Sequence, residues 1–437
     1  MASGSSRASE THTMINGAQN EQKIGLRPWQ HGAIFVFACA VVASHRPDAI
    51  FHAQFWAEDG RVWYADAYNL GWWHALFHAA AGYYQTLLRL GASLALLMPL
   101  SRAPLVLNLI AIAVQALPAN LVLSSRSSAW GSLRYRALLA GIYLALPNCK
   151  DMYAIITSSQ WELALCVFLL LVASTPRDVA GRLSDIFILL LCGLTGPFCI
   201  FLLPIAVVLA WRRRNRWQWA MTGTLAALCL VQAWGLLIVN PSGRSLPDAL
   251  GASPALFARI LAGQVYLGAL LGTNTLAFNP GPRLFAVLLL VAIGGTAIVV
   301  ICFIKSTVEM KLLLLLSSVL FAAALITPVA YAPAGVSRWQ MLAAAGGIRY
   351  WFFPTLAFAW SLLWCIRSRV VVLKIVSAAL LFVMCFGIIR DWRSPALKDK
   401  RFAEYVRRFE ASPSGTAVTI PLNPDGWSMC LVKRPPS

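Results

Sequence analysis

Long apolar segments separated by short polar loops run through most of this 437-residue chain. They recur from residue 31 to residue 389, and most are near the length that crosses a bilayer as a helix. Their predicted bounds are 31–50, 104–124, 137–147, 160–174, 184–195, 197–211, 218–239, 283–304, 312–330, 350–366 and 371–389. The pattern predicts an all-α polytopic membrane protein with about eleven transmembrane helices, built as one bundle over residues 31–389.

The long segment 51–103 follows the first span and is rich in Trp, Tyr and His. Such side chains suit a membrane surface, where one end of the ring is apolar and the other is wet. Residues 84–100 are long enough to cross, but Arg89 interrupts them. If they do not cross, most basic loops fall on the same side as the N-terminus, as the positive-inside rule requires. We therefore predict that 84–100 is interfacial or re-entrant, with the N-terminus inside and the C-terminus outside.

The ends of the chain and two interior stretches depart from the apolar pattern. Residues 1–30 are polar and Ser-rich and predict a disordered cytoplasmic N-terminus, whereas 390–437 predict a small outer tail. Within the tail, 396–410 have an amphipathic helix pattern, and AVTIPL and WSMCLV flank the turn NPDG, typical of a hairpin. Thr195-Gly196-Pro197 predicts a break between two short helices. Segment 240–282 predicts an outer loop with a helical piece near 254–272.

Composition supports a membrane protein and argues against nucleic-acid binding as the reason for the positive net charge. Hydrophobic residues make up 59% of the chain, charged residues 12%, and the mean hydropathy is +0.67. The net charge of +19 does not indicate nucleic-acid binding, because the basic residues lie in short loops between apolar segments. The ten cysteines lie almost all within apolar stretches without CxxC spacing, which is typical of small buried residues rather than a metal site.

The adjacent acids Glu58 and Asp59 are the first candidate for chemistry, because the chain has only 17 acidic residues. They follow the first span directly, and charge beside a bilayer is costly and tends to be functional. A carboxylate beside aromatic residues can have a raised pKa and can accept a proton from a hydroxyl. The alternative is that Asp59 caps a helix that begins near Gly60.

Two further constellations lie at predicted outer ends of spans. In GGIRYWFFP, Arg349 and Tyr350 form one, and Arg338 on the same loop is a second cation; arginine binds phosphate through two parallel hydrogen bonds. The alternative is an ordinary interfacial anchor. The other constellation is TSSQWELAL, whose polar and aromatic members are Gln160, Trp161 and Glu162. An acid in an apolar run indicates a site, and a structural pair with an arginine is the alternative for Glu162.

The histidines give a weaker signal. His74 and His78 are spaced i, i+4, and His52 precedes them, but none has the spacing of a defined metal site. We predict no metal site from these residues, and a divalent cation at the acids stays an open alternative.

The motifs FWAEDGRVWYADAYNLG, GYYQTLLRLGA, TSSQWELAL, GGIRYWFFP and IPLNPDGWSM together resemble a bacterial branch of the GT-C class of integral membrane glycosyltransferases. The class places acids in a long first outer loop after one span. The resemblance implies that Asp59 or Glu58 is the catalytic base or a metal-linked carboxylate. It also implies a polyprenyl-phosphate sugar in a cavity open to the outer leaflet. In this chain the two acids are adjacent rather than spaced, so the resemblance does not say which one acts.

Together these patterns predict a bacterial inner-membrane glycosyltransferase that transfers a sugar from a polyprenyl-phosphate carrier to a periplasmic envelope glycan or lipid, with inversion. Arg349 and Arg338 would bind the carrier phosphate, in a cavity shaped by 51–103, 148–159 and 240–282. The remaining predicted substrate-binding residues are Tyr350, Gln160, Trp161, Glu162, Trp56, Trp63, Tyr83 and Arg89. A transporter for lipid-linked glycans is the rival, favoured by the broken span, and a non-catalytic assembly subunit is a third reading.

Overall fold

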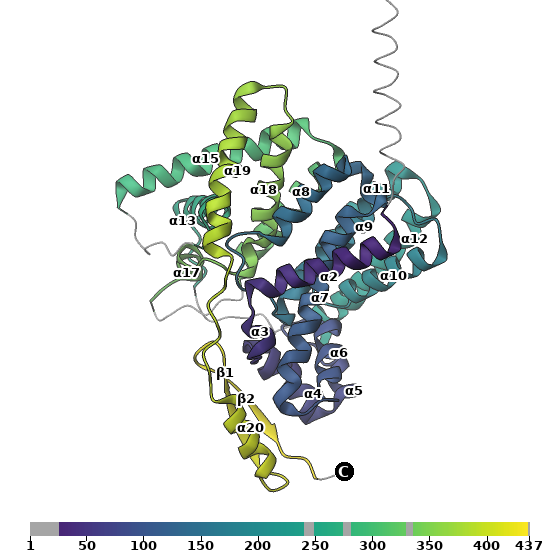
Figure 1. The fold of residues 1–437 in the computed structure, drawn as a ribbon, viewed down its shortest axis with the longest axis vertical. Helices are drawn as coiled ribbons and strands as arrows, with labels where there is room; N and C mark the ends of the chain where they lie inside the picture. Colours follow the sequence, from purple (N-terminus) through teal and green to yellow (C-terminus); the bar gives the residue numbers. More distant parts are fainter. Residues whose placement is uncertain (1–25, 240–248, 274–280, 329–334, 436–437) are drawn as a thin grey trace, which may run out of the picture.

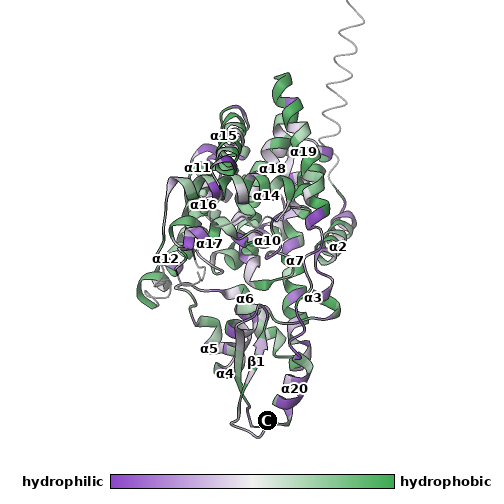
Figure 2. Ribbon diagram, turned by 90° about the vertical axis from the view of Figure 1, so that its left-hand side faces the viewer, coloured by the Kyte–Doolittle hydropathy of each residue, from purple (hydrophilic) through white to green (hydrophobic). Residues whose placement is uncertain are grey.

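A computed structural model describes residues 26–239, 249–273, 281–328 and 335–435 of the chain, as a helical bundle with a small C-terminal appendage (Figure 1). Most of the predicted N-terminal tail therefore lies outside the described residues, as do parts of the predicted loop 240–282. Figure 2 shows hydrophobic residues over most bundle helices and hydrophilic residues along α20 (Phe402–Ala411).

Each of the eleven predicted spans forms a helix. Their bounds are α2 (Pro28–His45), α7 (Ala103–Leu123), α8 (Leu133–Leu144), α9 (Ser159–Val172), α10 (Val179–Gly193), α11 (Phe198–Arg213), α12 (Arg216–Trp234), α15 (Pro282–Lys305), α16 (Val308–Ile326), α18 (Phe352–Ile366) and α19 (Val371–Asp391). Within the described part, six helices are long and apolar enough to cross a membrane: 100–123, 216–239, 254–271, 282–305, 308–326 and 371–391. The protein is a multi-pass membrane protein, and the number eleven stays a prediction.

The centre of the bundle is formed by α9 and α18. Every residue of α9 is buried, and α18 contributes large side chains that are almost fully inaccessible, among them Phe353, Phe358 and Trp360. By contrast, α15 and α19 expose many Leu, Ile, Val and Phe side chains. Exposed apolar side chains on long apolar helices are what a lipid-facing surface requires.

Segment 254–271 combines α13 (Pro254–Arg259), η6 (Ile260–Tyr266) and α14 (Leu267–Leu271). It has the length to cross a membrane, although the sequence pattern suggests a helical piece within a loop. The backbone N–H of Arg338 donates to Ala249 before the segment, and the N–H of Thr273 after it donates to the Asp391 carboxylate. Arg338 follows α16 and Asp391 ends α19, so both ends of the segment lie at the same end of the bundle.

The predicted break in the chain at Thr195-Gly196-Pro197 is confirmed. Helix α10 ends at Gly193, α11 begins at Phe198, and Gly196 has a φ of +79°, which favours glycine. The polar groups freed by the break bind the segment before α6 (Thr86–Ala95): the Gly196 N–H donates to Tyr84, and the Thr195 hydroxyl accepts from the Leu87 N–H. The break therefore fixes residues 84–87 in place.

The first loop folds into short elements: α3 (Asp48–Phe51), η1 (Asp59–Tyr64), α4 (Ala65–Leu70), α5 (Trp72–Phe77), α6 and η2 (Leu100–Arg102). Helix α6 has ten residues, about 15 Å at the usual rise, which is shorter than the apolar core of a bilayer. Its interfacial position stays a prediction. On α5 the Trp72, Trp73 and Phe77 side chains are all more than half exposed.

The C-terminal appendage consists of α20 and an antiparallel hairpin of β1 (Ala417–Leu422) and β2 (Trp427–Val432), which confirms the predicted hairpin. The helix begins at Phe402 rather than 396, because Arg401 has a left-handed backbone conformation and 394–400 are not helical. The appendage packs on the first loop: Phe402 lies edge-on to Phe55, 5.7 Å between ring centroids. A Cβ at Gly60 would lie 2.8 Å from the Leu422 side chain, so glycine permits this close approach.

The remaining described elements are η3 (Ser125–Trp130), η4 (Ile156–Ser158), η5 (Gly235–Val239), α17 (Arg338–Ala344) and η7 (Arg349–Trp351).

Candidate active site

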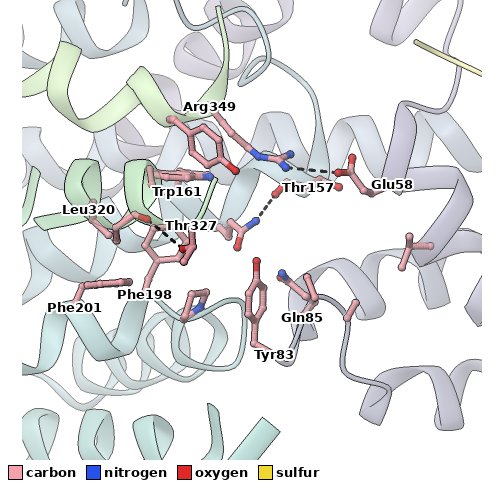
Figure 3. A pocket seen from close by; sticks show the side chains of 18 of the residues that line it. Glu58, Tyr83, Gln85, Thr157, Trp161, Phe198, Phe201, Leu320, Thr327 and Arg349 are labelled. Carbon is pink, nitrogen blue, oxygen red and sulfur yellow. Dashed lines mark hydrogen bonds and ion pairs between the residues drawn. The ribbon is translucent and has the colours of Figure 1, made fainter. Parts of the chain in front are cut away.

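A cavity of about 310 Å³ lies where η1, the start of α9, the end of α16 and η7 meet (Figure 3). Seven of the twelve predicted site residues line it: Glu58, Trp63, Tyr83, Gln160, Trp161, Arg349 and Tyr350. These residues come from segments far apart in the sequence. Their roles stay predictions, but the structure shows that these seven side chains border the same cavity.

The two opposite charges in the cavity wall belong to Glu58 and Arg349. The Arg349 Nη2 lies 3.6 Å from the Glu58 Oε1, and about a quarter of each side chain is exposed (23%). Figure 3 shows the pair at one side of the cavity, with Tyr83 and Gln85 pointing into the same space. A half-buried pair that borders a cavity can open toward an anionic ligand, because the ligand replaces the carboxylate as the partner of the arginine.

Asp59 lies behind the cavity wall. Its side chain is 1% exposed, and its Oδ1 accepts hydrogen bonds from the Thr157 hydroxyl at 2.5 Å and the Thr157 N–H at 3.2 Å. Its Oδ2 is buried and has no hydrogen-bond partner in the described part of the chain. The capping interpretation of Asp59 is wrong, because this side chain bonds to η4 and not to its own helical turn.

The environment of Asp59 favours its neutral form. The pKa of Asp59 is raised from its ordinary 3.8 to about 7, mainly by burial; the Thr157 hydroxyl opposes the rise and the Glu58 charge adds to it. A carboxyl with this pKa binds its proton more tightly in the folded than in the unfolded state. Above pH 7 the ionised form therefore makes the fold less stable, by roughly 4 kcal/mol.

We expect Asp59→Asn to raise the thermal unfolding midpoint at pH 8 and to change it little at pH 4. The penalty on the wild type grows as pH rises from about 4, where the unfolded carboxyl ionises, to about 7. Asn keeps an oxygen for the Thr157 donors and carries no charge. Unfolding of the detergent-purified proteins over pH 4–9 measures the difference, with exposed Asp425→Asn as the control. A difference between Asp59→Asn and the wild type that is independent of pH would contradict the burial argument.

Aromatic side chains form the rest of the wall and are held in place by polar contacts. The Trp63 Nε1 donates to the Thr157 Oγ at 2.7 Å, so one hydroxyl connects Trp63 to Asp59. Trp161 packs edge-on against Tyr350, with 6.0 Å between centroids. The Gln160 amide donates to the Thr157 carbonyl at 3.0 Å. A Cβ at Gly196 would lie 2.3 Å from the Gln160 Oε1, so the broken span leaves room for Gln160.

Five predicted residues do not line the cavity: Asp59, Trp56, Arg89, Arg338 and Glu162. Arg89 is fully buried behind Trp63, with its guanidinium 4.9 Å from the ring and 2.7 Å from the Asp66 carboxylate. Trp56 stacks under the Arg46 guanidinium instead, at 5.6 Å. Arg89 therefore supports the wall at Trp63 from outside the cavity.

Arg338 and Glu162 lie in other surroundings. Arg338 donates from Nη1 to the Pro328 carbonyl. Glu162 borders a separate cavity of about 20 Å³, the size of a single water site. The proposed Glu162–arginine pair is wrong for the described residues, because no arginine among them lies within ion-pair distance of Glu162.

The cavity also includes residues that the sequence analysis missed. Trp427, the first residue of β2, brings the C-terminal appendage into the wall, and Gln85 and Thr157 complete it. Thr157 lies within the noted TSSQWELAL motif, but a threonine in a loop carries no signal of its own. Trp427 follows the NPDG turn, and only the packing of the hairpin on η1 shows its position.

The donor groups do not fit a divalent cation. Among the described residues there is no group of three or more His, Cys, Asp and Glu side chains arranged to hold a metal ion. The Arg349 cation lies beside the Glu58 carboxylate, where it would repel a second cation. Of the histidines, His78 lies 3.7 Å from Asp66, and His52 and His74 are outside the cavity lining.

Comparisons with known proteins add little. No protein-family model matches the chain, and no curated protein sequence matches it. Among solved structures, a crystal structure of the Archaeoglobus fulgidus oligosaccharyltransferase, in complex with Zn and sulfate, matches with 13% sequence identity and a TM-score of 0.43. The match covers 87% of this chain and 56% of the other, so this chain spans little more than half of that enzyme. The score is too low to establish a shared fold.

Proposed function

We propose that this protein is a membrane glycosyltransferase that moves a sugar from a polyprenyl-phosphate carrier to the hydroxyl of an acceptor. The observation that carries the proposal is the pairing of Glu58 with Arg349 in the wall of an aromatic-lined cavity. A base and a phosphate-binding cation on one cavity are the two charges that this reaction needs. The acceptor is an envelope glycan or lipid, on the periplasmic face of a bacterial inner membrane.

In the proposed reaction Arg349 binds the carrier phosphate. Arginine holds phosphate through two parallel hydrogen bonds and keeps its charge when partly buried. When the phosphate takes the guanidinium, Glu58 loses its partner and becomes free to accept a proton. Binding of the donor would thus activate the base.

The acceptor oxygen then attacks the anomeric carbon as its proton passes to Glu58. The bond from that carbon to the phosphate oxygen breaks, and the phosphate leaves with the electron pair, next to Arg349. A single displacement of this kind inverts the anomeric carbon. Trp63, Tyr83, Trp161 and Tyr350 supply flat faces against which sugar rings pack.

Asp59 has a positioning role in this proposal. Its buried carboxyl holds the Thr157 hydroxyl, which in turn receives the Trp63 indole N–H. We assign the base to Glu58 because Glu58 lines the cavity and Asp59 does not.

The test is a transfer assay with purified protein in lipid nanodiscs and a panel of polyprenyl-phosphate sugars. We expect the wild type to transfer sugar from one of them. Arg349→Gln should raise the KM for the carrier at least about tenfold, because a hydrogen bond to a charged group contributes on that order. The control is Arg407→Gln, an exposed arginine on α20.

Equal activity of Arg349→Gln and the wild type would contradict the phosphate-binding role. The rival transporter is favoured by one observation, that the broken span borders the cavity through Pro197. Absence of transfer with every donor, together with carrier movement across liposomes, would replace the enzyme by that transporter.

A further inference from the structure

A second cavity, of about 300 Å³, lies at the opposite end of the bundle. Helix α16 connects the two ends: Leu320 and Thr327 line the first cavity, and Thr307 and Met310 line the second. Helix α18 runs between them as well, from Arg349 and Tyr350 just before it to Trp364 near its end. Met310 and Leu320 are ten residues apart on α16, about 15 Å at the usual rise, so the two cavities lie toward opposite ends of this helix.

Three inter-helix loops meet at this second cavity. It is lined by Ala129, Trp130 and Gly131 after α7, by Thr307 before α16, and by Arg367 after α18. These loops and the adjacent helix ends are rich in basic residues, as the positive-inside rule predicts for the cytoplasmic side. The basic residues on these elements are Arg126, Arg134, Arg136, Lys305, Lys311, Arg367, Arg369 and Lys374, of which Arg367 lines the cavity. The acid on these elements is Glu309, in the first turn of α16, and Asp185 of the neighbouring α10 pairs with Arg126.

Arg367 is the charged residue of the cavity wall, and it is available to a ligand. Its guanidinium lies 4.6 Å from the centre of the Tyr135 ring, and its side chain is exposed. No carboxylate of the described residues lies within ion-pair distance of it. A Cβ at Gly131 would lie 3.3 Å from the Arg367 Nη1, so glycine at 131 leaves space beside the guanidinium.

The start of α16 adds a second source of positive potential. Thr307, the N-cap residue, makes no side-chain hydrogen bond to the first turn, so the free N–H groups of that turn are not capped by it. The helix dipole favours an anion at this position. Around these polar groups the wall is apolar, from Trp130, Leu139, Met310 and Trp364. The combination fits an anion that carries apolar substituents.

We propose that this second cavity binds the phosphate of an anionic phospholipid headgroup. Arg367 and the start of α16 would hold the phosphate, and the aromatic side chains would contact the glycerol and the first acyl carbons. The position of the cavity at a basic end of a membrane bundle is where such a lipid is available. The site is separate from the proposed active site and does not depend on the proposed function.

The test titrates phosphatidylglycerol, and phosphatidylcholine with the same acyl chains, into detergent-purified full-length protein, and counts bound lipids by native mass spectrometry. We expect one phosphatidylglycerol to bind at least about tenfold more tightly than phosphatidylcholine, because a hydrogen bond to a charged group is of that order. Arg367→Gln should abolish the preference. The matched control is Arg369→Gln, an exposed arginine on the same loop that does not line the cavity, which should keep it.

A second variant tests the cavity itself while it keeps the Arg367 charge. Ala129 is exposed at the cavity wall, so Ala129→Trp should fill the cavity and abolish the preference while Arg367 is intact. An unchanged preference in Arg367→Gln or in Ala129→Trp would overturn the proposal. So would displacement of the lipid by inorganic phosphate alone, because the site would then be one for free phosphate.

Discussion

Glu58→Gln is expected to lower the rate of sugar transfer about 10²- to 10⁴-fold, the usual contribution of a general base. Glutamine has nearly the same shape but cannot take the proton from the acceptor hydroxyl. The substitution also frees Arg349, which lies 3.6 Å from the wild-type carboxylate. We therefore expect kcat to fall while the KM for the polyprenyl-phosphate sugar stays the same or decreases. Steady-state kinetics of the purified variant measures both.

The control is Glu410→Gln, an exposed acid on α20, which should transfer at the wild-type rate. Asp59→Asn makes a second comparison, because it removes a carboxyl behind the wall and leaves Glu58 in the cavity. A large loss of kcat in Asp59→Asn with a normal kcat in Glu58→Gln would assign the base to Asp59 instead.

Asp66→Asn is expected to destabilise the fold by roughly 3 kcal/mol, because it leaves the buried Arg89 charge without its partner. The Arg89 side chain is 1% exposed and lies 2.7 Å from the Asp66 carboxylate; its other acceptors are the carbonyls of His78 and Val62. An asparagine at position 66 still offers Arg89 an oxygen but no negative charge, so the buried guanidinium keeps most of its desolvation cost. The thermal unfolding midpoint in detergent measures the loss.

The double variant Asp66→Leu with Arg89→Leu should be more stable than either single one, since it leaves no unpaired charge. Asp425→Asn is the matched control for an exposed pair: Asp425 binds Lys398 and Lys400 at the surface, and its loss should leave the midpoint unchanged. If Asp66→Asn and Asp425→Asn behave alike, Arg89 does not depend on its partner.

The helices were predictable because their signal is local. Apolar runs such as 283–304 and 371–389 avoid water along their whole length. Composition alone therefore predicts bounds close to those of α15 and α19. The break at Gly196-Pro197 and the hairpin around NPDG follow from backbone chemistry within a few residues. The position of segment 254–271 was harder to predict. Its length fits a membrane span, whereas the contacts of its two ends place both at the same end of the bundle.

Within the site, the sequence determined which residue types stand out and not where they point. The rarity of acids in an apolar chain singles out Glu58 and Asp59, but adjacent residues on a helical turn point in different directions. Only the tertiary structure places Glu58 at the cavity and Asp59 against Thr157. Likewise, Arg349 and Arg89 are both arginines at membrane boundaries, and only packing separates the one that faces Glu58 from the one beneath Trp63.

The sequence by itself thus determined a helical membrane protein, the positions of its helices, and a short set of polar residues. The tertiary structure decided that seven of those residues surround one cavity, that Trp427 joins them from the other end of the chain, and that a second cavity forms where three basic loops meet. The physical reason is the distance along the chain over which each interaction acts. Hydrophobicity and backbone preference act within a few residues, whereas a site is made by contacts between segments hundreds of residues apart.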